Sequence, residues 1–155
     1  MSRAFVKEPE GDAAIDDLPE RPVSHHPNLV TSKGLALIET EVARLHREHA
    51  AAQAANDRAT LARTARDLRY WSSRRASAQV VAPPADATEA HFGSTVTIER
   101  DDGRRQTFRI VGEDEADPAR GTLSHASPLA RALFGKAVGD RIAAGQSHAE
   151  VLEIQ

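Results

Sequence analysis

Residues 32–54 carry a regular seam of mostly apolar side chains, spaced alternately by three and four positions. The seam positions are Leu35, Ile38, Val42, Leu45, His49 and Ala52. Charged side chains lie between them, an arrangement typical of one helix of a coiled coil. Because Thr31 or Ser32 can accept hydrogen bonds from a first helical turn, we expect a helix that begins there and ends near Ala54.

A second, weaker seam follows in residues 58–81. Its positions are Leu61, Ala65 or Thr64, Leu68, Trp71 and Ala78. Between the two seams stand Asn56 and Asp57, whose side chains favour turns, and Asp57 can cap the second helix. The Pro-Pro pair at residues 83–84 cannot continue a helix. The two seams therefore predict an antiparallel helical hairpin that is too polar to form a sizeable core alone.

The hydrophobic period changes to two after a linker at residues 83–91, which is rich in Pro and Ala. Alternating residues predict strands at 95–99 and 106–111, joined by an Asp-Asp-Gly turn. Three more short strands are expected at 121–124, 141–143 and 150–154, with one helix at 127–135. Ser127 would cap this helix, with Pro128 at its first position. The expected buried face consists of Phe92, Val96, Ile98, Phe108 and Ile110.

These patterns predict an α+β fold: an N-terminal antiparallel coiled-coil hairpin, then a small antiparallel β domain with one short helix. The expected parts are a tail at residues 1–28, the hairpin at 29–82, the linker at 83–91 and the β domain at 92–155. The tail is acidic and Pro-rich, with few apolar residues, so we expect it to be disordered. It is either a solvated leader or an acidic segment that docks on a basic surface of a partner.

Composition excludes several function classes. The chain has no cysteine, which rules out disulfides, thiolate metal sites and cysteine nucleophiles. Its net charge of -3 argues against nucleic-acid binding through bulk positive charge. The adjacent pair His25 and His26 supplies fewer ligands than zinc needs, so no metal site of its own is expected. Without a long apolar run or a signal-like leader, we expect a cytoplasmic protein that does not enter a membrane.

The second predicted helix is rich in arginine, and Arg58, Arg66 and Arg69 lie near one side of it. Two interpretations are open. The arginines either form a solvated surface, partly paired with glutamates of the first helix, or they contact an acidic protein surface or the phosphates of a nucleic acid such as nascent RNA.

Four runs of sequence together carry a family resemblance. They are Leu29-Val30-Thr31 with Gly34, Phe92-Gly93-Ser94-Thr95-Val96, residues 109–117 (RIVGEDEAD), and residues 127–136 (SPLARALFGK) followed by Val138-Gly139-Asp140. Over residues 29–154 the chain resembles the bacterial GreA/GreB transcript-cleavage factors.

The resemblance implies a fold and a partner. In that family a coiled coil precedes an FKBP-like domain, which docks on the rim of the secondary channel of RNA polymerase. An Asp and a Glu at the coiled-coil tip help to hold a magnesium ion in the polymerase active centre, where backtracked RNA is cut. Ser127, Pro128 and Leu129 then become candidate polymerase contacts. A monomer, DNA binding within the transcription complex and no cofactor of its own are further expectations.

The tip departs from the family pattern. Asp57 matches the family Asp, but Thr60 stands where the family has Glu. A different alignment uses Asp67 as the acidic residue and again leaves the pair incomplete. The hairpin also lacks about two heptads in total, one per helix, which shortens its reach by roughly 10 Å at 1.5 Å per residue.

Three hypotheses follow. The protein is an elongation factor that stimulates cleavage through Asp57, or a Gre-like modulator that binds the channel without strong cleavage and is not itself an enzyme. The second hypothesis includes a regulator similar to the regulators of nucleoside diphosphate kinase, competing for the channel. A third, prolyl isomerase activity of the FKBP-like domain, is disfavoured because its few Phe residues are needed for the core.

Overall fold

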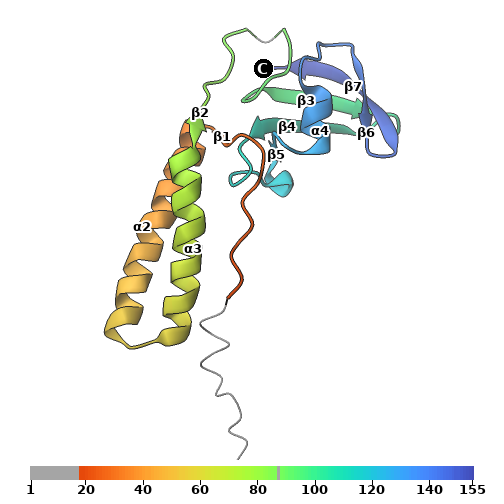
Figure 1. Ribbon diagram of the computed structural model, residues 1–155. Coiled ribbons are helices and arrows are strands. Elements are labelled where there is room, and N and C mark those ends of the chain that lie inside the picture. The colour runs from red at the N-terminus through yellow and green to blue at the C-terminus, as the bar shows by residue number, and fades with distance from the viewer. Residues whose placement is uncertain (1–17, 87) are drawn as a thin grey trace, which may run out of the picture. The chain divides into compact units, whose positions relative to one another are not determined.

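The computed structural model describes residues 18–86 and 88–155 (Figure 1). The helices are α2 (Ser32–Ala54), α3 (Arg58–Ser77), α4 (Pro128–Leu133) and the 3-10 helix η1 (Pro118–Arg120). The strands are β1 (Leu29–Val30), β2 (Gln79–Val80), β3 (Thr95–Arg100), β4 (Arg105–Val111), β5 (Thr122–Ser124), β6 (Arg141–Ala144) and β7 (Ser147–Ile154). The predicted α+β class is confirmed.

The chain divides into two compact units. One contains Glu39–Ala76 with the described residues up to Ser24, and the other contains His25–Ile38 and Ser77–Gln155. The division falls within both long helices, so the first turns of α2 group with the sheet. This differs from the predicted boundaries, which assign residues 29–82 to the hairpin. Residues 18–28 also take a defined path with specific contacts, whereas a disordered tail is predicted there, and residues 1–17 lie outside the described residues.

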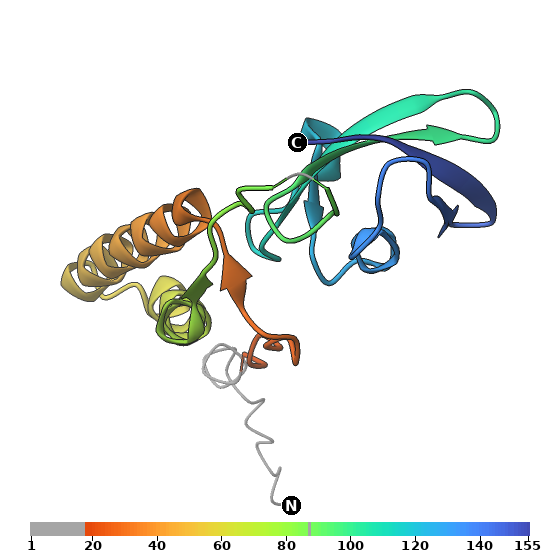
Figure 2. The ribbon, with the colours of Figure 1, turned by 90° about the horizontal axis from the view of Figure 1, so that it is seen from above.

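Helices α2 and α3 run antiparallel and side by side (Figures 1 and 2). The first seam forms as predicted, with Val42, Leu45 and Ala52 all buried. In the second seam the open choice between Thr64 and Ala65 is decided for Thr64, which is fully buried. Its hydroxyl donates to the Thr60 carbonyl oxygen at 2.7 Å and lies 2.7 Å from His49 Nδ1. A polar pair therefore occupies one layer of the hairpin core.

Helix α3 ends four residues earlier than predicted, at Ser77 rather than near Val81. The following residues form β2, which pairs in parallel with β1. The Val81 amide donates to the Val30 carbonyl oxygen at 2.9 Å, a bond that a helical Val81 could not make. This two-stranded ladder competes successfully with helix extension because β-branched Val80 and Val81 fit a strand better than a helix.

The start of α2 is fixed to the loop after β4 within the same compact unit. The Thr31 hydroxyl accepts the Gly34 amide at 2.9 Å, as an N-cap does, and donates to the Glu115 carboxylate at 2.7 and 2.8 Å. Gly112 lies against β1, where a methyl group on it would stand 2.6 Å from the Leu29 carbonyl oxygen. The family-like runs at residues 29–34 and 109–117 therefore meet in space.

The five-stranded sheet has the order β5-β4-β3-β7-β6. Strand β3 pairs antiparallel with β4 and with β7, and β6 pairs antiparallel with β7. The β4–β5 pair is parallel, which corrects the prediction of a purely antiparallel sheet. The reason is the connection: residues 112–121, including η1, carry the chain back before β5 begins, so both strands run in the same direction.

The core of this unit lies on one face of the sheet. Four of the five residues predicted there are 5% exposed or less: Phe92, Val96, Ile98 and Ile110. The fifth, Phe108, is partly buried and packs against this core. Helix α4 covers that face with Ala130 and Leu133. Its cap is as predicted, since the Ser127 hydroxyl accepts the Ala130 amide at 3.3 Å.

Candidate functional site at the hairpin tip

The tip is a three-residue connection between α2 and α3. Asn56 adopts a left-handed conformation with φ of 52°, which Asn tolerates better than most residues. Its amide donates to the Gln53 carbonyl oxygen at 3.3 Å, and the Asp57 amide donates to the Ala52 carbonyl oxygen at 3.0 Å. This pair of bonds is a Schellman motif, which ends α2 and turns the chain sharply into α3.

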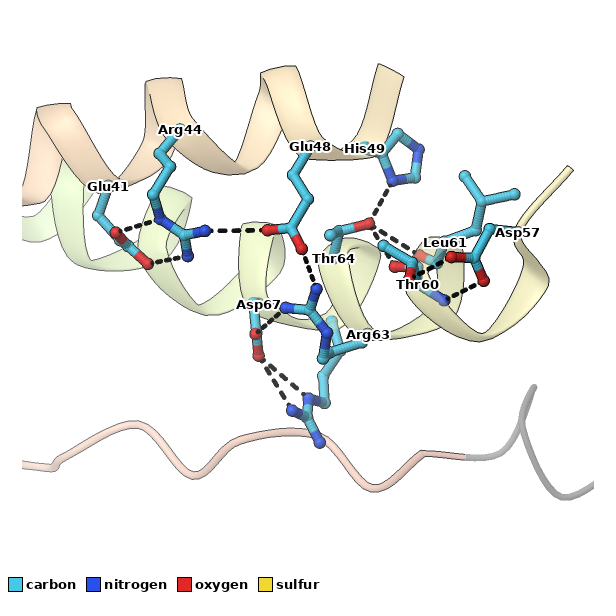
Figure 3. Close-up of polar contacts among 11 residues, drawn as sticks. Glu41, Arg44, Glu48, His49, Asp57, Thr60, Leu61, Arg63, Thr64 and Asp67 are labelled. Carbon is cyan, nitrogen blue, oxygen red and sulfur yellow. Dashed lines mark hydrogen bonds and ion pairs between the residues drawn. The ribbon is translucent and has the colours of Figure 1, made fainter. Parts of the chain in front are cut away.

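Asp57 caps the next helix, as the sequence predicts. One carboxylate oxygen accepts the Thr60 amide at 3.1 Å, and the other accepts the Thr60 hydroxyl at 2.6 Å (Figure 3). These bonds from the Thr60 hydroxyl and amide lower the pKa of Asp57, helped by the charge of Arg63. Asp57 is therefore an exposed anion at neutral pH with both oxygens already hydrogen-bonded.

Thr60 determines what the tip can do chemically. It donates to the Asp57 carboxylate, whereas an acidic side chain would place a second negative charge there. Between Glu48 and Asp67 the sequence contains one acidic residue, Asp57. The described tip therefore presents one carboxylate rather than a pair.

The alternative acidic residue, Asp67, is not brought to the tip. It lies ten residues along α3 from Asp57, roughly 15 Å at 1.5 Å per residue. Its side chain is 14% exposed and pairs with Arg66 at 3.1 Å, Arg21 at 3.5 Å and Arg63 at 3.8 Å. With three guanidinium groups around it, Asp67 serves as a structural counter-ion.

A ladder of ion pairs crosses the hairpin (Figure 3). On α2, Arg44 contacts Glu41 at 2.6 Å and Glu48 at 2.9 Å. Glu48 in turn pairs with Arg63 of α3, which contacts Asp67. For Arg63, the expected pairing of second-helix arginines with first-helix glutamates is thus present. These exposed pairs orient the two helices, although each contributes little to stability.

The three arginines proposed as nucleic-acid contacts have different surroundings. Arg66 donates to Asp67 at 3.2 Å, and Arg69 donates to Glu20 at 3.0 and 3.1 Å. Arg58 is exposed at the first position of α3, next to the tip. The guanidinium groups of Arg66 and Arg69 therefore already hold carboxylates of this chain.

The predicted docking residues open helix α4. Ser127 uses its hydroxyl to cap the helix, and Leu129 is partly buried against the core. Pro128 at the first helical position is exposed. Pro128 is therefore the exposed member of this trio, whereas Ser127 and Leu129 are half-buried.

The comparisons with known proteins identify the family. A family model described as "Transcription elongation factor, GreA/GreB, C-term" matches residues 85–155. The transcription elongation factor GreA of Desulfovibrio desulfuricans is 33% identical over 135 residues, which cover 86% of this chain and 80% of that protein. The chain belongs to the GreA/GreB family.

Other relatives match the GreA/GreB-family chain over shorter or more divergent regions. The transcription elongation factor GreB of Neisseria meningitidis serogroup B is 41% identical over 96 residues, 58% of this chain. The match spans 59% of that protein's own length. A solved GreA/GreB structure from Nitrosomonas europaea is 19% identical, with a TM-score of 0.42 over 83% of this chain and 98% of that one.

Residues 18–86 and 88–155 contain no group of three or more acidic or histidine side chains placed to hold a metal ion. Within the same residues, no helix combines the length and apolar character needed to cross a bilayer.

Sequence reasoning missed the part played by Glu20 and Arg21, which contact α3 across 46 or more residues of sequence. The available signal was their opposite charge in an otherwise acidic, Pro-rich segment facing an arginine-rich helix. Nothing in the sequence spacing sets the register between the two segments.

Proposed function

We propose that this protein binds RNA polymerase at the rim of the secondary channel and modulates elongation, including backtracked complexes, without efficient stimulation of transcript cleavage. Membership in the GreA/GreB family and the printed names of its relatives, transcription elongation factors, support the partner and the process. We further propose that it acts as a cytoplasmic monomer and is not itself an enzyme.

The observation that carries the cleavage part of the proposal is the Asp57–Thr60 contact. Cleavage by the family pattern needs two carboxylates that help to hold a metal ion and a water in the polymerase. Here the second position supplies a hydroxyl, and this hydroxyl engages the remaining carboxylate at 2.6 Å. A lone carboxylate that caps a helix does not fit the role of a metal-holding pair.

The docking part of the proposal rests on the start of α4. The Ser127 cap and the buried Ala130 and Leu133 fix this short helix on the sheet, so Pro128 is presented on a rigid support. A rigid, exposed proline loses little conformational entropy on binding, which favours its use in an interface.

A second candidate function, cleavage stimulation through Asp57 alone, has one observation in its favour. Asp57 is an exposed anion at the extreme end of the hairpin, and each of its oxygens retains a lone pair beyond the bond from Thr60. The non-cleaving alternative, a regulator similar to those of nucleoside diphosphate kinase that competes for the channel, shares the docking mode proposed above.

Competition with an authentic Gre factor tests the proposal. Backtracked elongation complexes with labelled RNA are incubated with a fixed amount of authentic factor and increasing amounts of this protein. We expect the authentic factor's cleavage to fall as this protein occupies the channel. Undiminished cleavage at saturating protein would refute channel binding. The Thr97→Val variant, altered on the exposed sheet surface away from the proposed docking residues, should compete as well as the unchanged protein.

A further inference from the structure

The segment of residues 19–24, here called the strap, lies along α3 within one compact unit (Figure 1). Two adjacent strap residues of opposite charge, Glu20 and Arg21, contact α3. The Glu20 carboxylate accepts hydrogen bonds from Arg69 Nε at 3.0 and 3.1 Å and from Arg69 Nη2 at 2.5 Å. Arg21 reaches Asp67 at 3.5 Å, two residues earlier on the helix. The strap therefore meets α3 in one charge-matched register.

The surroundings of Arg21 form a site for a guanidinium group. Its Cζ lies 4.0 Å from the centre of the Tyr70 ring and 5.6 Å from the centre of the Trp71 ring. The two rings meet edge to face, with centroids 5.2 Å apart and planes at 87°. Two aromatic rings and one carboxylate around the same guanidinium group suit a flat, delocalised cation.

We propose that Asp67, Tyr70 and Trp71 form an arginine-binding site on α3, and that the strap is its intramolecular occupant. An arginine-bearing segment of a protein partner would take the same place. The Asp67 carboxylate, which also pairs with Arg63 and Arg66, attracts the guanidinium group of a protein segment, whereas a phosphate would have to approach it against like charge. The neighbouring Arg69 adds a preference for an acidic residue immediately before that arginine, as Glu20 precedes Arg21.

The contacts suit a displaceable occupant. The side chains of Arg21, Glu20 and Arg69 are 36%, 62% and 57% exposed, so water and salt reach both ion pairs. Exposed pairs of this kind are individually weak. The strap holds its place through its high effective concentration, since it is joined to the same chain. A partner segment must bind tightly enough to displace the tethered strap, so the strap sets a minimum affinity for any partner.

Trp71 is the one tryptophan of the chain, so its fluorescence reports on the site directly. The experiment compares the full-length protein with the full-length Arg21→Gln variant. We expect Trp71 in the variant to be quenched more readily by acrylamide and to shift its emission. A synthetic peptide with the sequence of residues 18–24 should then bind the variant at least about tenfold more tightly than the unchanged protein, because its own arginine meets an empty site.

Two controls separate this site from a general loss of charge. Arg105→Gln removes an arginine from the exposed pair with Glu99 and should leave both readouts unchanged. Adding Asp67→Asn to Arg21→Gln should abolish peptide binding while circular dichroism shows the helices intact. Equal quenching in the Arg21→Gln and unchanged proteins, with no peptide binding, would overturn the proposal. Binding of an oligouridylate instead of the peptide would overturn it too, in favour of nucleic acid.

Discussion

Thr31 offers a direct test of how the start of α2 is anchored. Its hydroxyl makes both the N-cap bond to the Gly34 amide and the donor bond to the Glu115 carboxylate. Thr31→Val keeps the shape of this side chain, which is 3% exposed, and removes both bonds. Losing an N-cap costs about 1 kcal/mol, and losing a hydrogen bond to a charged group costs about 1.5 kcal/mol. Because one hydroxyl makes both bonds, we expect about 2 kcal/mol rather than their full sum.

The assay is urea unfolding of the full-length protein at neutral pH, followed by circular dichroism. Thr97→Val is the matched control, because the Thr97 hydroxyl pairs with Thr107 at 2.9 Å on the exposed sheet surface. That change should cost less than about 0.5 kcal/mol. Hydrogen exchange adds a local readout: the Gly34 amide should lose protection in the Thr31→Val variant. Equal unfolding midpoints for the Thr31 and Thr97 variants would refute the proposed anchor.

Three further predictions follow from the same contacts. Gly112→Ala places a methyl group 2.6 Å from the Leu29 carbonyl oxygen and should cost about 1–3 kcal/mol in urea unfolding, whereas an unchanged midpoint would show that β1 is free to shift. The bonds from Arg69 lower the pKa of Glu20. Their contribution to holding the strap on α3 is therefore complete above the usual carboxyl pKa and is lost as pH falls through the lowered pKa. Acrylamide quenching of the tryptophan should rise only at that acidic pH, and a rise near neutral pH would contradict this. Pro128→Ala should weaken polymerase binding about tenfold in a pull-down titration without changing the unfolding midpoint, and unchanged affinity would exclude that surface.

Local signals made much of the fold predictable. The seam spacing located α2, and the Asn-Asp turn with its capping side chain located the tip to the residue. Ser127 and Pro128 likewise placed the start of α4. In each case the determining bonds join residues within a few positions of each other, so one short stretch of sequence contains both partners.

Non-local pairing accounts for what sequence reasoning missed. Val80 and Val81 lie inside the predicted second helix, and the helix ends earlier because these residues pair with strand β1, some 50 residues away. The parallel direction of β5 depends on the path of the preceding connection rather than on its own three residues. The Arg21 site is of the same kind, because its components are individually ordinary charged and aromatic residues.

The tip shows how sequence and structure combine. The sequence alone identifies Thr60 as a departure from the family pattern. The structure adds that the Thr60 amide and hydroxyl both donate to the Asp57 carboxylate, so the residue that stands in place of the family Glu also engages the one acid that remains. Because Asn caps helices as well as Asp does, Asp57→Asn removes the charge and keeps the cap, which makes it the informative variant for function.

The most direct test of the central claim is the length of labelled RNA in backtracked elongation complexes after this protein alone is added. We predict that the RNA keeps its full length at protein concentrations that suppress cleavage by an authentic Gre factor, and that Asp57→Asn behaves identically. RNA shortening by the unchanged protein that disappears with Asp57→Asn would contradict the account.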